Sequence, residues 1–117
     1  MRWLVDAMNV IGSRPDGWWR DRESAMRDLV LDLDSFARGA GEQVTVVFDG
    51  GPIELPQPES VEAVFAPSAD DAIADAVARD PDPQGVTVVT SDVELAARVR
   101  AAGARVTGAG AFRRRLG

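Results

Sequence analysis

Short apolar runs that end at polar residues divide the chain into candidate strands. Residues 3–5 lead into Asp6, residues 44–48 lead into Asp49, and residues 86–89 lead into Thr90-Ser91-Asp92. Uninterrupted runs of this length indicate strands buried on both faces, as in the centre of a parallel sheet. Residues 61–65 alternate between apolar and polar or exposed positions, which predicts an edge strand that Pro67 ends.

A different spacing, with apolar residues every three or four positions, predicts the helices. Residues 25–37 give the clearest helix, with Asp21 as a candidate N-cap and Gly39 or Gly41 at its end. The preceding segment, residues 12–21, is rich in glycine and proline and is predicted to be a loop.

The second half of the chain repeats the alternation of strand and helix. Residues 68–79 predict a second helix, and residues 91–102 predict a third helix capped by Ser91. A short last strand is expected at 104–107, followed by a terminal helical turn around 112–116. This order predicts a single domain over residues 1–117, built as a three-layer α/β/α sandwich with a mainly parallel central sheet.

Acidic residues stand where the carboxyl ends of the central strands would meet. Asp6, Asp49 and Asp92 follow three buried strands, Asp70 begins the second helix, and Asn9 lies three residues after Asp6. Ligands of open parallel sheets bind beyond this edge, at the point where the strand order reverses. These five residues are therefore the candidate catalytic residues.

Each acidic residue also has an ordinary structural explanation. Ser68-Ala69-Asp70-Asp71 and Ser91-Asp92-Val93-Glu94 both have the form of a capping box, which would use these side chains to cap the start of a helix. Helical geometry separates the neighbouring pair, because Asp70 lies beside the apolar face of its helix and Asp71 lies nearly opposite it. Asp70 is therefore the preferred ligand, and Asp71 remains an alternative.

Carboxylates brought within about 4–6 Å of one another repel unless a cation lies between them. Mg²⁺ and Mn²⁺ prefer oxygen ligands of this kind. We expect Asp6, Asp70 and Asp92 to bind one of these ions, with Asp49 as a further candidate ligand.

Composition removes most other catalytic chemistry. The chain has no histidine, lysine, tyrosine or cysteine, so all 13 basic residues are arginines. This excludes imidazole bases, Schiff bases, phosphate-binding lysines and zinc sites built from histidine and cysteine. The net charge of −6 argues weakly against a nucleic-acid partner, although carboxylates that hold a metal would present a cation instead. No apolar run is long enough to span a membrane, and we expect a cytoplasmic protein.

Four short motifs in this order resemble a known family. Asp6-x-x-Asn9, Asp49 after a buried strand, Ala69-Asp70-x-x-Ile73 and Thr90-Ser91-Asp92 are similar to the NYN domain of the PIN-like nuclease superfamily, in particular its small bacterial YacP-like group. The resemblance covers essentially the whole chain, with Met8 standing where that family often has an aromatic residue. It implies a PIN-like fold and a metal-dependent endoribonuclease, with Asp6, Asp49, Asp70 and Asp92 in its acidic site and Asn9 as their polar companion.

Candidate RNA contacts lie mainly in the loop before the first long helix: Arg14, Trp18, Trp19, Arg20 and Arg22. Guanidinium groups bind phosphates, and an exposed indole stacks on an unpaired base. At least one of the two tryptophans is expected to close the edge of the core instead. Ser91 could contact a phosphate, although helix capping competes for its hydroxyl.

Alternative functions remain open from the residues alone. A receiver domain would need a lysine, and a haloacid-dehalogenase-like domain would need an Asp-x-Asp-x-Thr start; both are missing. The main alternative is a non-catalytic module that binds RNA or the ribosome on the same scaffold. Partners beyond RNA also stay open, since either the ribosome or a second copy of the chain in a homodimer could complete the site.

Overall fold

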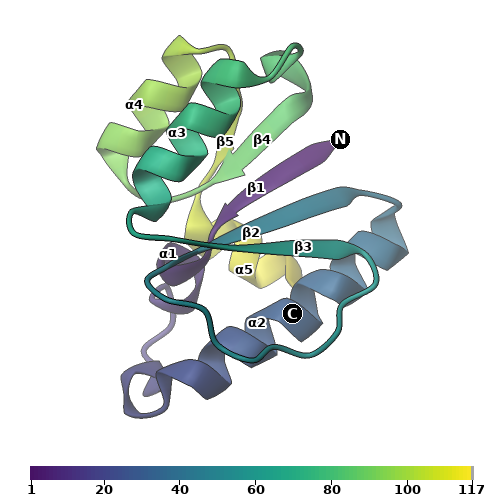
Figure 1. Ribbon diagram of the computed structural model, residues 1–117, viewed down its shortest axis with the longest axis vertical. Coiled ribbons are helices and arrows are strands. Elements are labelled where there is room, and N and C mark those ends of the chain that lie inside the picture. The colour runs from purple at the N-terminus through teal and green to yellow at the C-terminus, as the bar shows by residue number, and fades with distance from the viewer. Residues whose placement is uncertain (117) are drawn as a thin grey trace.

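The computed structural model describes residues 1–116, which form one all-parallel, five-stranded sheet with helices on both faces (Figure 1). The strands are β1 (Arg2–Asp6), β2 (Gln43–Asp49), β3 (Val61–Ala66), β4 (Val86–Val89) and β5 (Arg105–Thr107). Their order in the sheet is β3-β2-β1-β4-β5, so β1 is central and β3 and β5 form the edges. The predicted three-layer fold with a parallel sheet is confirmed.

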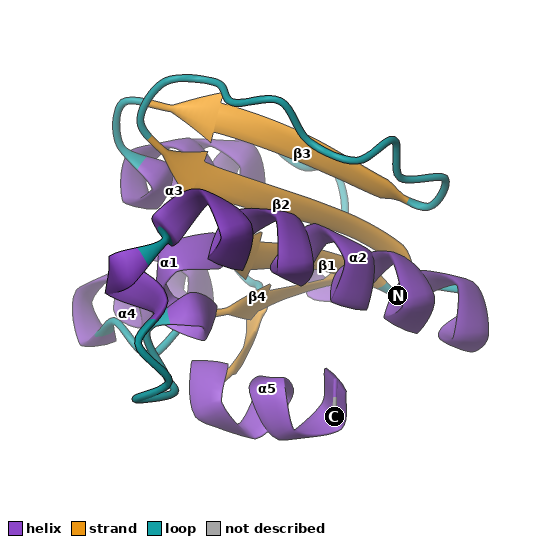
Figure 2. Ribbon diagram, turned by 90° about the horizontal axis from the view of Figure 1, so that it is seen from below, coloured by secondary structure: helices purple, strands orange, loops and turns teal. Residues whose placement is uncertain are grey.

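Five α-helices cover the sheet: α1 (Ala7–Ile11), α2 (Arg22–Ala40), α3 (Ala69–Arg79), α4 (Val93–Ala101) and α5 (Ala109–Leu116). Figure 2 shows α2 in front of the sheet, with α3 and α4 behind it. Two short 3₁₀ turns, at Trp18–Arg20 and Pro83–Gly85, lie in the connecting loops. None of the helices within residues 1–116 is long and apolar enough to cross a membrane.

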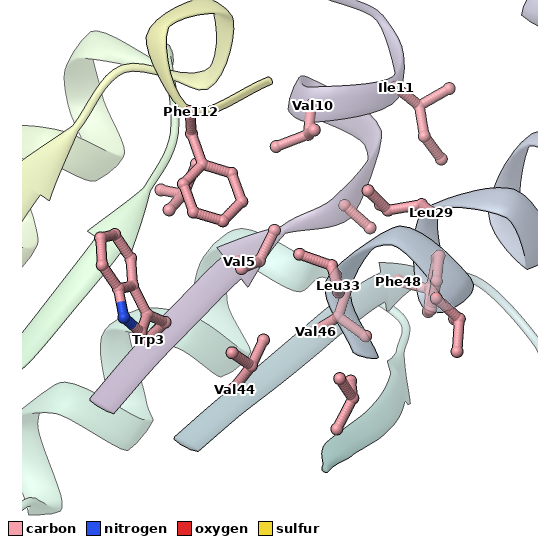
Figure 3. Packing of buried hydrophobic residues seen from close by; sticks show 14 of the residues in the cluster. Trp3, Val5, Val10, Ile11, Leu29, Leu33, Val44, Val46, Phe48 and Phe112 are labelled. Carbon is pink, nitrogen blue, oxygen red and sulfur yellow. The ribbon is translucent and has the colours of Figure 1, made fainter. Parts of the chain in front are cut away.

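The two faces of the sheet bury separate apolar cores. On one face, Val5 and Val46 from the central strands pack against Leu33 of α2 and Phe112 of α5 (Figure 3). Trp3 closes this core, with its ring 5.3 Å from that of Phe112. On the other face, residues of α3 and α4 pack on β2 and β4; they are Ile73, Val77, Leu95, Val99, Val47 and Val88. Continuous burial of the central strands follows from this double cover.

Helix α2 shows the predicted signals at both ends. The Asp21 carboxylate accepts a hydrogen bond from Ser24 N at 3.1 Å, which confirms Asp21 as the N-cap. The helix begins at Arg22, three residues earlier than its apolar pattern indicated. At the other end, Gly41 rather than Gly39 ends the helix, because its φ of 67° is a left-handed conformation that glycine adopts without strain.

Helix α1 was not predicted. The chain turns directly from β1 into this five-residue helix, which buries Ala7, Val10 and Ile11. A segment of about one and a half turns is too short to show a helical period in the sequence. The helix matters for the site because it fixes Asn9 one turn beyond Asp6. The predicted terminal turn is likewise a longer element, the eight-residue helix α5.

Asp34 secures the long connection between β2 and β3. This carboxylate on α2 is only 7% exposed and accepts hydrogen bonds from Glu59 N at 3.0 Å and Ser60 N at 2.7 Å. Two backbone amides bound by one carboxylate hold the loop against the helix. The loop that follows Asp49 is therefore attached to the domain at its far end as well as at β2.

Candidate active site

The carboxyl edge of the sheet brings the predicted acidic residues together. Asp6 ends β1, Asp49 ends β2, and Asp92 follows β4 at the start of α4. Asp70 lies in the first turn of α3, which begins at the same edge. The strand order reverses between β1 and β4, so the group occupies the position where parallel sheets bind ligands.

Asp6 is the buried centre of this group, with 1% of its surface exposed. Its Oδ2 atom accepts hydrogen bonds from Asn9 Nδ2 at 2.8 Å and from Thr90 Oγ1 at 3.0 Å. Asn9 Oδ1 in turn accepts from Ser91 N at 3.1 Å, and Thr90 Oγ1 accepts from Asp92 N at 3.1 Å. Asp6 and Asn9 are thus held against the segment that links β4 to α4.

Asp49 and Asp92 each use one oxygen to bind the start of a helix. Asp49 Oδ1 accepts from Ala69 N of α3 at 2.8 Å, and Asp92 Oδ1 accepts from Leu95 N of α4 at 3.0 Å. Among residues 1–116, no hydrogen bond reaches the second oxygen of either carboxylate, or Oδ1 of Asp6. Capping and ligand binding are therefore compatible in these residues, because each carboxylate has one oxygen for each role.

Ser91 does not cap α4, contrary to the prediction. The N-cap is Asp92, one residue later. The Ser91 hydroxyl instead accepts a hydrogen bond from Ala109 N, the first residue of α5, at 3.0 Å. Ser91 therefore connects two elements that meet only in the folded chain, and its role as an RNA contact stays a prediction.

The two aspartates of α3 have different surroundings. Asp70 is half-buried, whereas Asp71 is exposed and forms an ion pair with Arg98 of α4 at 3.0 Å. Ser68 Oγ caps the helix at Asp71 N, but the Asp71 carboxylate turns to Arg98 instead of completing the capping box. The structure thus groups Asp70, and not Asp71, with the strand-end carboxylates.

The four carboxylates at this edge influence one another's ionisation. Burial raises the pKa of Asp6 to about 6; the Thr90 hydrogen bond opposes the shift, and the charges of Asp70, Asp49 and Asp92 add to it. Burial also raises the pKa of Asp70, with Asp92 and Asp49 as the next causes. Repulsion among these groups disfavours full ionisation and favours a bound cation.

The donor atoms suit a hard divalent ion in kind. All are oxygens, and no nitrogen or sulfur ligand competes with them. Among residues 1–116, however, no three acidic side chains are already arranged to hold a metal ion. The structure therefore brings suitable ligands to one edge without forming a finished coordination shell.

The predicted RNA-binding loop is only partly connected to this edge. Trp18 packs against the core, as expected for one tryptophan of the pair, while Trp19 is 57% exposed. Arg22 reaches the site, because its Nη2 atom donates to Asp49 O at 3.2 Å. Arg20 lies over the Trp19 ring at 6.0 Å, and within the described residues neither Arg14 nor Arg20 forms a hydrogen bond with the carboxylate group.

Thr90 is a site residue whose role its sequence context did not predict. It is 2% exposed and its hydroxyl connects Asp6 to the backbone of Asp92. Its position after an apolar run predicted a strand end and said nothing of the direction of the hydroxyl. The available signal was the adjacency of Thr90 and Asp92, since a hydroxyl two residues before a helix cap can bind its backbone.

Comparison with known proteins agrees with this fold. The family model for the YacP-like NYN domain matches residues 3–117. The chain is similar to the crystal structure of Rae1 (YacP) from Bacillus subtilis, with a TM-score of 0.84 and 25% identity over 99% of this chain and 73% of that one. A crystal structure of a Trp-to-Leu mutant of the same Bacillus subtilis protein gives a TM-score of 0.83 and 25% identity, over 98% of this chain and 74% of that one. No curated protein matched the chain. The chain belongs to the YacP-like NYN domain family.

Proposed function

We propose that this domain is a metal-dependent endoribonuclease that hydrolyses RNA phosphodiesters at the carboxylate group of Asp6, Asp49, Asp70 and Asp92. The NYN family is nuclease-like and related to RNA, which supports the class of reaction. The observation that carries the proposal is that the buried Asp6 lies at the same edge of the sheet as Asp49, Asp70 and Asp92. Burial first, and then the charges of these neighbours, raise its pKa. A site that gathers such charges at a ligand-binding edge is a functional candidate on physical grounds.

Asp6, Asp70 and Asp92 would hold the ion, with Asp49 as a further ligand. Mg²⁺ or Mn²⁺ would supply a water of lowered pKa and would neutralise charge on the phosphate. Asp6, Asp49 and Asp92 approach with one oxygen already anchored by a hydrogen bond, which orients the other. Asp70 has no such anchor among residues 1–116, so its side chain is the one free to adjust.

Asn9 acts as a positioning residue in this proposal. Its amide is held at both ends, by Asp6 Oδ2 and by Ser91 N. This leaves its second N–H available for a phosphate oxygen. The positive surface for the RNA would come from Arg22 beside Asp49 and, further out, from Arg14 and Arg20, with the exposed Trp19 available to stack on a base.

Cleavage of an RNA panel tests the proposal. The panel contains single-stranded and hairpin RNAs, incubated with Mn²⁺, with Mg²⁺ or with EDTA. We expect cleavage by the wild type only with a divalent ion, and a loss of at least about 100-fold in Asp70→Asn. Asp75→Asn is the matched control, because Asp75 is an exposed carboxylate on the same helix.

Two results would contradict the nuclease assignment. One is cleavage that persists in EDTA. The other is Asp70→Asn cleaving as fast as the Asp75→Asn control. RNA binding without any cleavage by the wild type would favour the alternative, a non-catalytic RNA- or ribosome-binding module.

A further inference from the structure

A groove of about 200 Å³ leads away from the carboxylate site along the side of α4. It begins at Ser91 and Asp92, and it extends between α4 and the edge strand β5 to Arg100. Helix α4 and β5 pack side by side, with β5 as the last strand of the sheet (Figure 1). The groove therefore begins beside Asp92 of the carboxylate site and runs along one side of the molecule.

One face of α4 forms a wall of this groove. Val93, Ala96 and Arg100 follow at spacings of three and four residues, which places them in one row on the helix surface. Val93 is 82% exposed, an unusual position for a valine that has only a packing role. Arg98 lies on a different face of the helix and pairs with Asp71 of α3.

The charge along the groove is unlike that of the whole protein. The chain carries a net charge of −6, yet Asp92 is the acidic residue of this lining and Arg100 is its basic one. Among residues 1–116, the guanidinium of Arg100 forms no ion pair and no hydrogen bond. An unpaired arginine beside the apolar side chains of Val93, Ala96 and Val106 fits a phosphate next to a sugar or base.

A second groove opens on the opposite side of the site. It has a volume of about 150 Å³, and its lining includes Arg22, Glu23 and Asp49. Because β1 lies between β2 and β4 in the sheet, Asp6 lies between the two grooves. A strand that crosses this edge from Arg22 over the carboxylates would then turn along the side of α4, where Arg100 lies in the last turn of the helix.

We propose that the groove between α4 and β5 binds the RNA strand as it leaves the carboxylate site, with Arg100 contacting a backbone phosphate. The proposal rests on the nuclease function proposed above and assigns one side of its substrate path. Arg100 lies eight residues after Asp92, or about 12 Å along the helix. At ~3.4 Å per stacked nucleotide this places the contact about three or four nucleotides from the cleaved bond.

Binding of a labelled single-stranded RNA of 12 nucleotides tests the groove. Fluorescence anisotropy is measured in Mn²⁺ over a series of salt concentrations, with all variants made in an Asp70→Asn background to prevent cleavage. Arg100→Ala should raise the Kd about three- to tenfold at low salt. It should also reduce the slope of log K against log salt by about 0.7, the value for one phosphate contact with a single strand. Arg100→Lys should retain most of the slope because it keeps the charge.

Two further variants make the result specific. Arg79→Ala is the control, because Arg79 is also exposed and unpaired within the described residues and also lies in the last turn of its helix, α3, but does not line the groove. It should leave the Kd and the slope unchanged. Val93→Glu changes an exposed side chain at the mouth of the groove and should weaken binding without unfolding the protein.

The outcomes separate the groove from the nuclease. If Arg100→Ala and Val93→Glu both bind like the Arg79→Ala control while the otherwise unmodified protein cleaves RNA, the groove does not bind RNA, and the nuclease proposal is retained. If RNA binding depends on Arg100 but the unmodified protein cleaves no RNA, the nuclease proposal is wrong, and RNA binding in the groove is retained. An unmodified protein that neither binds nor cleaves RNA would contradict both.

Discussion

Asp6→Asn should raise the free energy of unfolding by about 1–3 kcal/mol at pH 7.5 in EDTA, even though Asp6 is the centre of the site. The folded protein holds this carboxyl with a pKa of about 6, above its ordinary value of 3.8. Because the raised pKa means that the folded state binds the proton more tightly, ionisation of Asp6 destabilises the fold as pH rises from about 4 to 6. Asparagine removes that charge and keeps an oxygen for the Thr90 hydroxyl.

The pH dependence identifies the cause. Urea unfolding at pH 7.5 should show the full gain in stability, and unfolding near pH 4 should show little of it, because Asp6 is largely protonated there in the folded state. Asp71→Asn serves as the control, since it neutralises an exposed carboxylate paired with Arg98. Its effect should stay within about 0.5 kcal/mol. A loss of stability in Asp6→Asn at pH 7.5 would show that the ionised Asp6 carboxylate does not destabilise the fold.

Substitutions of Asp92 should separate helix capping from catalysis. Asp92→Asn should keep the stability of the wild type within about 0.5 kcal/mol, because asparagine caps helices as well as aspartate does. The same variant should lose RNA cleavage by at least about 100-fold, since it removes a charged candidate ligand. Asp92→Ala should lose both, with a destabilisation of about 1–2 kcal/mol from the missing hydrogen bond to Leu95 N.

Thermal unfolding and the cleavage assay together measure this separation. Asp92→Asn and Asp92→Ala should be equally impaired in cleavage but should differ in stability. If Asp92→Asn cleaves RNA like the wild type, Asp92 is a helix cap without a part in the reaction. If both variants are equally destabilised, the carboxylate charge contributes to the cap more than its geometry indicates.

The strands and their polar ends were predictable because simple rules apply there. A buried central strand in a parallel sheet needs apolar residues on both faces, and the runs before Asp6 and Asp49 show this directly. Parallel strands share one carboxyl edge, so the meeting of their terminal aspartates followed from the strands alone, whereas the order of the strands in the sheet came only from the structure. The preference for Asp70 over Asp71 near the site came from the rotation of about 100° per helical residue.

The parts that were missed depend on contacts between distant segments. Ser91 and Asp92 are both good helix caps, and their sequence alone does not decide which one begins α4. Ser91 instead binds Ala109 N, a partner 18 residues away. The hydroxyl of Thr90 likewise reaches Asp6 across 84 residues, so its role appears only when β1 and β4 lie side by side.

The central claim is that four carboxylates at the edge of the sheet bind a divalent ion, and calorimetric titration with Mn²⁺ tests it most directly. The wild type should bind Mn²⁺ and release about half a proton per ion at pH 6, where Asp6 is half protonated, and close to none at pH 8. Comparing buffers of different ionisation enthalpy measures this proton release. Asp6→Asn should bind Mn²⁺ much more weakly and release less proton per ion at pH 6 than the wild type. Equal Mn²⁺ binding by the wild type and by Asp6→Asn, or no binding by either, would contradict the account.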